Sequence, residues 1–319
     1  MKPNPTLGIL YPGEMGAALA AVLRAGGARV VTTLRGRSPQ TAHRCRDAGV
    51  EILDSLADVV RQSEVVFSIV PPRAAEEVAG AYCEHAHLAP PRVVYVDVNS
   101  IGPELAAALA ARVERRGAAF IDAAINGLAK NLGKSGTLYL SGRRAAEIER
   151  LFAGAVHVRL LGDEPGRAST MKMILGGLSK GVTALFAELA VLADRSSMLD
   201  EATREASRIY PGITEVALRM LPTYPAHAAR RADEMRELER NANTAGLQPC
   251  VIAAVRRLHE SLTASFPSPR ENTDGWTPQR VIKQLLVNQI VEVPSEGGEI
   301  WPASPVPHTC TPAQVSASK

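Results

Sequence analysis

Residues 8–16 have the types and spacing needed to bind a phosphate group. They read GILYPGEMG and stand between a short apolar run and an alanine-rich stretch, the order of a strand followed by a helix. Gly13 would let a pyrophosphate approach the backbone, and Gly16 would let the helix pack closely on the strand. Free N–H groups at the start of the helix would bind phosphate oxygens. Tyr11 occupies the place of the usual first glycine. We predict a dinucleotide site whose first contacts are Tyr11, Pro12, Gly13, Glu14 and Met15.

The residues after the second predicted strand favour one cofactor over another. Residues 33–38 read TLRGRS and contain no acid to hold the ribose 2′-hydroxyl of NAD(H). Arg35, Arg37 and Ser38 would suit a 2′-phosphate, because arginine presents a charged fork to phosphate oxygens. The alternative is that both arginines are ordinary surface residues. The sequence therefore predicts NADP(H) rather than NAD(H).

Lys172 is the residue expected to move a proton. It stands near the start of residues 168–198, which lack proline and repeat long apolar side chains at helical spacing. A position in the first turn of this helix, together with partial burial, would lower the pKa of the lysine and suit general acid or base catalysis. The alternative is an exposed lysine without a role.

Several polar residues are candidates to position a substrate or the cofactor. Ser100, Asn126 and Gly127 follow predicted strands, and serine or asparagine can donate hydrogen bonds to a carboxylate or carbonyl. Val70, Pro71 and Asn99 are assigned to the cofactor site because they end neighbouring strands. For Asn99, a turn-forming role before residues 101–103 is an equal alternative.

Four charged or polar residues in the second half would share one helix face. His227, Arg230, Arg231 and Glu234 are spaced i, i+3, i+4 and i+7. This face is either a solvated surface with internal ion pairs or a part of the active site that binds an anionic substrate group. His227 and Arg230 are included among the candidate substrate-binding residues on the second interpretation.

The elements that must position these residues alternate between strands and helices. Apolar runs such as VVFSIV and VVYVDV are typical of strands covered on both faces. The pattern predicts an α/β protein with a Rossmann-type doubly wound parallel sheet over residues 1–165. A long interdomain helix would join it to an all-helical domain, residues 166–290, for substrate binding and dimerisation. Residues 291–319, rich in Pro, Ser, Thr and Gly, are expected to be disordered.

Composition excludes several classes of function. A net charge of +3 with scattered basic residues argues against nucleic acid, and four separate cysteines without a CxxC pair argue against a metal site. The sequence contains no long apolar stretch that is free of charged residues, so it predicts no membrane span. The N-terminal apolar run is too short for a signal peptide. A cytoplasmic protein is expected.

Four segments in order resemble the β-hydroxyacid dehydrogenase superfamily, which includes 3-hydroxyisobutyrate and 6-phosphogluconate dehydrogenases and the related imine reductases. Residues 8–16 are similar to its GxxGxGxMG motif. Residues 97–100 (DVNS) resemble its substrate loop, and residues 122–138 resemble its D-A-P-V-S-G-G…G-T-L segment. The sequence from Gly166 to Lys172 resembles the G-x-G-x-x-x-K that opens its interdomain helix. The C-terminal domain is similar to that of phosphogluconate dehydrogenases, in a less characterised branch.

The resemblance implies roles for individual residues. Lys172 corresponds to the general acid/base of the family, and Gly176, beside Gly177, replaces an asparagine that contacts substrate, which would leave room for a bulkier group. It also implies a homodimer with a shared active-site cleft, in which the 227–234 face serves its own or the partner's site. A β-hydroxy acid dehydrogenase is favoured. An imine reductase and a non-catalytic NADP-binding protein remain alternatives, and the sequence does not indicate the substrate or the direction.

Overall fold

The computed structural model describes residues 4–152, 154–266 and 275–287. The predicted tail at residues 291–319 lies outside this part of the chain. The N-terminal domain contains one sheet of eight strands, β1 (Thr6–Leu10), β2 (Arg29–Thr33), β3 (Glu51–Leu53), β4 (Val65–Ser68), β5 (Val94–Asp97), β6 (Ala119–Asn126), β7 (Thr137–Ser141) and β8 (His157–Leu160). Its α-helices are α1 (Glu14–Ala25), α2 (Pro39–Asp47), α3 (Leu56–Gln62), α4 (Ala75–His85), α5 (Pro103–Glu114), α6 (Leu132–Ser135) and α7 (Ala145–Glu149).

The strand order β3-β2-β1-β4-β5-β6-β7-β8 confirms the doubly wound Rossmann-type fold. All neighbouring strands are parallel except β6 and β7, which are antiparallel. The order reverses between β1 and β4, and ligands of such sheets bind outside the carboxyl ends of the strands at this point. The short strands β3 and β8 were not predicted, because both are largely exposed and lack an apolar run.

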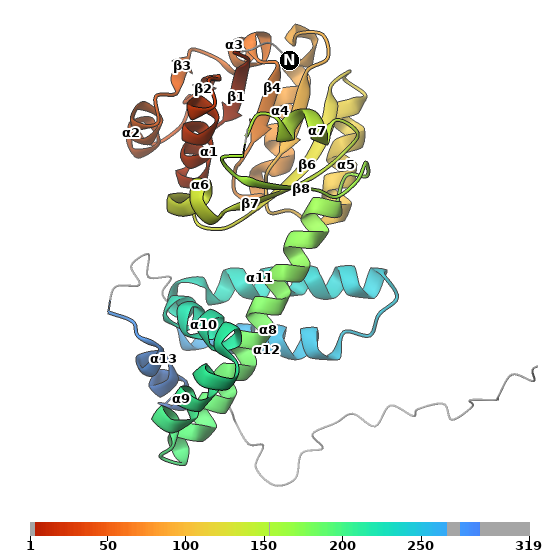
Figure 1. Cartoon of the computed structure of the whole chain (residues 1–319). Coiled ribbons are helices and arrows are strands. Elements are labelled where there is room, and N and C mark those ends of the chain that lie inside the picture. The colour runs from red at the N-terminus through yellow and green to blue at the C-terminus, as the bar shows by residue number, and fades with distance from the viewer. Residues whose placement is uncertain (1–3, 153, 267–274, 288–319) are drawn as a thin grey trace, which may run out of the picture.

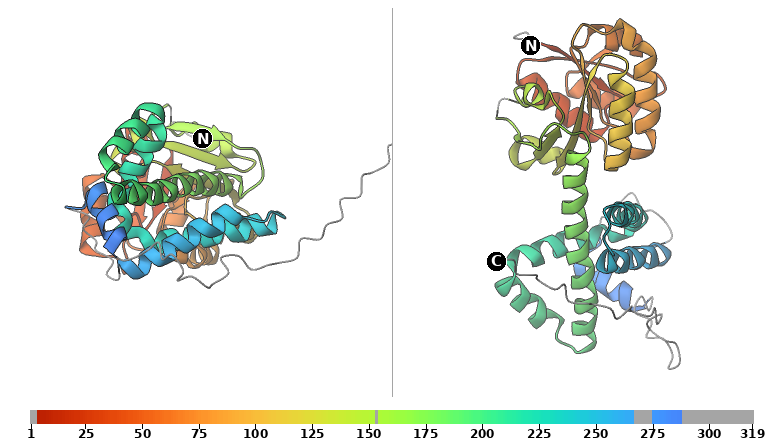
Figure 2. Two further views of the ribbon diagram at one scale, coloured as in Figure 1. Left: turned by 90° about the horizontal axis from the view of Figure 1, so that it is seen from below. Right: turned by 90° about the vertical axis from the view of Figure 1, so that its right-hand side faces the viewer.

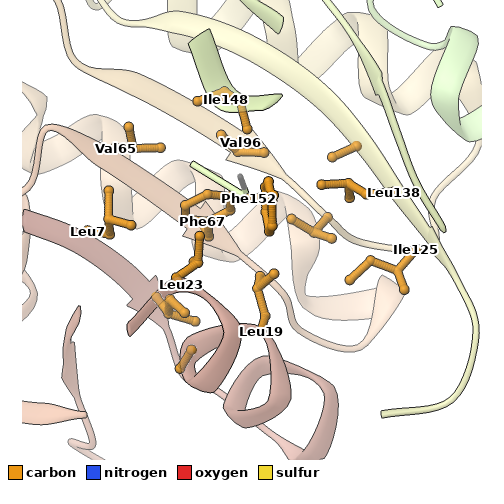
Figure 3. Close-up of a cluster of buried hydrophobic side chains, with 14 of the residues drawn as sticks. Leu7, Leu19, Leu23, Val65, Phe67, Val96, Ile125, Leu138, Ile148 and Phe152 are labelled. Atoms are coloured by element: carbon orange, nitrogen blue, oxygen red, sulfur yellow. The ribbon is translucent and has the colours of Figure 1, made fainter. Parts of the chain in front are cut away.

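Two apolar cores cover the two faces of the sheet. The first packs α1 against residues such as Leu7, Phe67 and Val96 (Figure 3). The second packs α4 and α5 on the other face around Tyr82, Tyr95 and Phe120. Burial on both faces is why β4 and β5 read as continuous apolar runs. The strand ends that carry the candidate site residues are thereby held rigidly.

A single long helix joins the two halves. Helix α8 (Arg167–Arg195) begins at the sheet and runs through the helical domain, as Figures 1 and 2 show. That domain contains α9 (Leu199–Ile209), α10 (Pro211–Met220), α11 (Tyr224–Thr244), α12 (Cys250–Ser265) and α13 (Pro278–Val287). Gly177 allows close approach of α8 and α11, because a Cβ there would lie 2.4 Å from Leu238 Cδ2. The predicted all-helical second domain is confirmed over the described residues.

Helix α8 is also long and apolar enough to cross a membrane, judged by length and composition alone. One such helix is weak support for a membrane span, since core helices share these properties. Of the most apolar 18-residue stretch of α8, 33% is buried inside the protein. Helices α10, α11 and α12 pack against α8 there. The packing accounts for the apolar composition of that face.

Candidate functional site

The glycine-rich turn lies at the reversal point of the sheet. Residues 11–13 connect β1 to α1, and Gly13 is the N-cap residue of α1. Among the described residues, no atom lies within 4 Å of the position that a Cβ of Gly13 would take, so a phosphate could approach the backbone there. A Cβ on Gly16 would meet Pro12 and Ile69 at 2.8 and 2.9 Å, which explains the third glycine. Glu14 and Met15 form the first turn of α1 as expected.

Tyr11 stands in the place of the usual first glycine and has a backbone conformation that favours glycine. Its φ is +52°, the left-handed region that side chains other than glycine rarely adopt. The guanidinium of Arg37 lies 4.0 Å above the Tyr11 ring, a cation–π contact between the turns after β1 and β2. Arg35 and Arg37 are exposed beside α2, which Ser38 caps by accepting a hydrogen bond from the Thr41 N–H. Arg37, one of the residues predicted to choose the cofactor, thus lies against the turn predicted to bind it.

Asn99 is buried and holds two strand ends together. Its Oδ1 accepts a hydrogen bond from the Val70 N–H at 2.6 Å, and its Nδ2 donates to Ser68 Oγ and to Asp97 Oδ2. Every polar atom of the side chain is therefore engaged within the protein. Asn99 fixes the Val70–Pro71 segment, and we assign it a positioning role instead of direct contact through its side chain.

Lys172 reaches across the junction of the two domains. Its Nζ lies 2.6 Å from Oγ of Ser100, which follows β5 in the N-terminal domain. The structure corrects one expectation, because α8 begins at Arg167 and Lys172 therefore lies in its second turn. Burial lowers the pKa of Lys172, and the cations of Arg230 and Lys180 lower it further, whereas Glu234 opposes them. A lysine in this setting can exchange a proton more readily than an exposed one.

Asp122 begins the motif at residues 122–138, but it was not predicted as a site residue. It is 1% exposed, and its carboxylate accepts hydrogen bonds from Gly166 N, Ser169 N and Ser169 Oγ at 2.9, 3.0 and 2.7 Å. Ser141 Oγ also donates to it. Asp122 thus satisfies the free N–H groups at the start of α8 in place of a local cap. Because Lys172 lies one turn further on, Asp122 fixes its direction.

Asn126 and Gly127 lie at the carboxyl end of β6, where Asn126 pairs with Thr137 of β7, four residues beyond the pairing of Asp122 with the end of β5. Both are exposed, so they are free to contact a ligand. Gly127 has a φ of +144°, and a Cβ there would lie 3.1 Å from the Gly136 Cα. Only glycine fits this turn. The structure brings these two residues to the same edge of the sheet as Ser100.

His227, Arg230, Arg231 and Glu234 all lie on α11, and two of them act on Lys172 of the same chain. Arg230 and Glu234 are close enough to shift the pKa of Lys172. Arg230 Nη1 donates to Glu234 Oε1 at 3.0 Å. Burial and the two arginines lower the pKa of His227. This face therefore contributes to the surroundings of its own lysine.

The space beside Gly176 is not open, contrary to expectation. A Cβ at this position would lie 3.1 Å from Lys180 Nζ, and the same Nζ donates to the Gly176 carbonyl at 3.1 Å. Lysine side chains in a helix point toward its N-terminus, so Lys180 reaches back one turn. Its ammonium also pairs with Glu234 at 2.9 Å. A second lysine, absent from the sequence-based predictions, thus occupies the room that Gly176 provides.

Other features of the chain add nothing to this site. A cavity of about 440 Å³ lies beside β8, between Gly133 and Val158, and shares no residue with the predicted contacts. Within the described residues, no group of three or more His, Cys, Asp or Glu side chains could hold a metal ion.

Comparison with known proteins identifies the family. Residues 6–152 match the NAD binding domain of 6-phosphogluconate dehydrogenase, and residues 193–262 match a domain of unknown function (DUF1932). A solved conserved protein, described as structurally similar to 3-hydroxyacid dehydrogenases, is 32% identical to this chain. That comparison covers 81% of this chain and 97% of the other, with a TM-score of 0.67. This chain belongs to the β-hydroxyacid dehydrogenase superfamily.

Two further proteins resemble this chain in sequence or in fold. A 28.5 kDa protein of Methanothermus fervidus is 26% identical over 258 residues, which is 80% of this chain and 98% of that protein. Mycobacterium tuberculosis 3-hydroxyisobutyrate dehydrogenase shares the fold, with a TM-score of 0.72 at 18% identity and coverage of 88% and 99%. The match to the NAD binding domain of 6-phosphogluconate dehydrogenase and the membership of this family support an oxidoreductase with a nicotinamide cofactor.

Proposed function

We propose that this protein is an NADP(H)-dependent oxidoreductase that interconverts a hydroxyl and a carbonyl group on a small, anionic β-hydroxy acid or related compound. The observation that carries the proposal is the 2.6 Å contact between Lys172 Nζ and Ser100 Oγ at the edge of the sheet where the cofactor would lie. A proton-transfer group and a hydrogen-bond donor are thereby held at one place. General acid/base catalysis requires this arrangement.

Lys172 would transfer the proton at the reacting oxygen. In reduction its ammonium protonates the developing alkoxide, and in oxidation its amine accepts the hydroxyl proton. Ser100 Oγ orients the same oxygen, while Asn126 and Gly127 contact the rest of the substrate. The nicotinamide ring, when bound, supplies or accepts the hydride.

The preference for NADP(H) rests on the turn after β2. Arg35 and Arg37 are exposed there, and residues 33–38 contain no carboxylate. Arg37 already lies over Tyr11, at the edge of the pyrophosphate turn. A 2′-phosphate would therefore meet two guanidinium groups and the N-terminus of α2, all of which favour negative charge.

The test is NADPH oxidation with matched β-keto acids, aldehydes and cyclic imines. The proposal predicts turnover of keto acids above the other two classes. Preference for the imines would favour the imine reductase alternative, in which Lys172 has a supporting role. Tight NADPH binding without turnover of any compound would favour the non-catalytic alternative.

We also propose that the protein is a homodimer and that a second copy covers α8. Five large apolar side chains on this helix are more than half exposed: Ile174, Leu178, Leu185, Leu189 and Leu192. At roughly 100° per residue they fall within about 60° of one another, so they form one stripe. An exposed apolar stripe of this kind is typical of an interface.

Light scattering after size exclusion tests the dimer. Leu185→Lys combined with Leu189→Lys should give a monomer, because two charges would be buried in the interface. Leu247→Lys is the matched control, since Leu247 is 62% exposed outside the stripe. A dimer that survives the double substitution would contradict the proposed surface.

A further inference from the structure

The helical domain contains a buried arginine that lacks an acidic partner. Arg231 is 5% exposed. Its Nη2 donates to Thr223 Oγ1 at 2.6 Å, and its guanidinium lies 4.9 Å from the centre of the Tyr224 ring. Among the described residues, no hydrogen-bond acceptor reaches its Nη1. A buried charge without a counter-ion costs several kcal/mol, so folded proteins rarely keep one without a use.

The groups around Arg231 carry an excess of positive charge. Lys180, Arg230 and Arg231 are cations, and Glu234 is the one carboxylate that pairs with members of this group in the described residues. Two positive charges are left over. Acids elsewhere on the same helix are engaged with other partners, since Asp233 pairs with Arg236 and Glu237 with Arg240.

Two further buried polar atoms lie in the same region. Tyr224 and His259 pack with ring centres 5.5 Å apart, and Tyr224 Oη and His259 Nε2 lack partners within the described structure. His259 Nδ1 lies 2.9 Å from the Val255 carbonyl, so this nitrogen carries the proton and Nε2 is an acceptor. Burial lowers the pKa of His259 to about 4, so the ring is neutral near pH 7. His259 Nε2, as an acceptor, cannot bind an anion, but Arg231 Nη1 and Tyr224 Oη are two unsatisfied donors on adjoining side chains that a negatively charged group could satisfy.

We propose that Arg231 and Lys180 bind a second anionic group of the substrate, a carboxylate or a phosphate remote from the carbon that reacts at Lys172. This inference rests on the proposed function and names its substrate class. Lys172 and Lys180 are eight residues apart, or about 12 Å along α8. With a hydrogen bond of about 3 Å at each end, the substrate spans roughly 4–7 Å between the reacting carbon and the remote anion. A dianionic hydroxy or keto acid with three to five intervening bonds fits this span.

The experiment compares pairs of compounds that differ in one remote carboxylate. Binding is measured by calorimetry on the full chain with adipate, hexanoate and inorganic phosphate, and turnover with 3-oxoadipate and 3-oxohexanoate in the presence of NADPH. Wild type is expected to bind adipate at least tenfold more tightly than hexanoate, and KM should be lower by a similar factor for 3-oxoadipate. Phosphate should compete with adipate.

Variants separate a binding role from a structural one. Arg231→Met should remove the preference for the dianion, raising KM for 3-oxoadipate with little change in kcat. Lys180→Gln should remove the same preference, and it should also raise the pKa of Lys172, because the Lys180 cation lowers that pKa. Arg231→Met should leave the ligand-free protein at least as stable as wild type in urea, because an uncompensated charge has been replaced by an apolar group. Arg236→Gln is the control, since Arg236 is an exposed arginine of α11 held in surface ion pairs.

Each outcome decides one proposal. Equal binding of adipate and hexanoate by wild type would overturn the anion site, whatever the enzyme turns over. So would a dianion preference that persists in both variants, or a large loss of stability in Arg231→Met. A dianion preference in binding with no NADPH turnover would support the anion site and count against the proposed oxidoreductase activity.

Discussion

Lys172 Nζ and Ser100 Oγ, 72 residues apart in the sequence, lie 2.6 Å from each other across the junction of the two domains. This contact joins the edge of the sheet to the helical domain at the point where a substrate would react. It makes the chemistry depend on both domains.

We expect Lys172→Gln to lower kcat by roughly 10²–10⁴ without changing NADPH affinity, because general acid/base catalysis contributes that much. Ser100→Ala should have a smaller effect, measured by the same steady-state assay with fluorescence titration of NADPH. Full activity in Lys172→Gln would exclude the proton-transfer role.

The charges around Lys172 predict opposite effects of two neighbouring substitutions on the pH profile. Glu234 raises the pKa of Lys172, and Arg230 lowers it. Reduction needs the ammonium form, so the rate of reduction falls as pH rises through this pKa. Glu234→Gln should therefore move that limb of the kcat/KM profile to lower pH, and Arg230→Gln should move it to higher pH. Arg236→Gln should leave it in place. Shifts in the same direction for Glu234→Gln and Arg230→Gln would be inconsistent with Lys172 as the titrating group.

The turn after β2 predicts the cofactor preference. Replacing both Arg35 and Arg37 by alanine should weaken NADPH binding at least tenfold and leave NADH binding nearly unchanged, because NADH lacks the 2′-phosphate that the guanidinium groups would bind. Dissociation constants for both cofactors provide the measurement. Arg44→Ala, in the neighbouring helix α2, serves as the control. An equal loss for NADPH and NADH would rule out the 2′-phosphate assignment.

Asp122 is predicted to matter for stability as well as for activity. Asp122→Ala would leave Gly166 N and Ser169 N without their acceptor at the buried start of α8. The expected loss is about 2–4 kcal/mol in the free energy of unfolding by urea, since buried donors would be left unsatisfied. The value of kcat should fall too, because α8 directs Lys172. Ser38→Ala removes a surface cap and should cost only about 1 kcal/mol. Similar losses for the two variants would show that Asp122 is not the main support of α8.

Asp97 is predicted to make the protein less stable as pH rises through neutrality. Burial raises its pKa from 3.8 to about 7, although hydrogen bonds from Asn99 oppose the shift. The folded state therefore binds a proton that the unfolded state releases near pH 4. The stabilisation is complete below pH 4 and is lost as pH rises through 7. Urea unfolding between pH 5 and 8 should show a fall that is absent in Asp97→Asn and present in the surface control Asp163→Asn. An unchanged slope in Asp97→Asn would assign the pH dependence to another group.

The sequence by itself determined the central strands, the interdomain helix and the local form of the turn at residues 8–16. Apolar runs predicted the central strands, because a strand covered on both faces must be apolar along its length. Helical periodicity predicted residues 168–198, and α8 spans Arg167–Arg195. The turn at residues 8–16 could be predicted because its glycines meet local steric requirements, and Tyr11, in the place of the usual first glycine, has a left-handed backbone.

Only the tertiary structure decided what surrounds Lys172. Asp122 caps a helix that begins 45 residues later, and Lys180 fills the space that Gly176 leaves. The side chain of Asn99 forms hydrogen bonds with Val70 and Asp97 inside the protein. Local patterns record which side of an element is buried, but they do not record which distant atom satisfies a polar group. The packing of α8 against α11 decides which charges set the pKa of Lys172. The same packing leaves Arg231 without an acidic partner among the described residues.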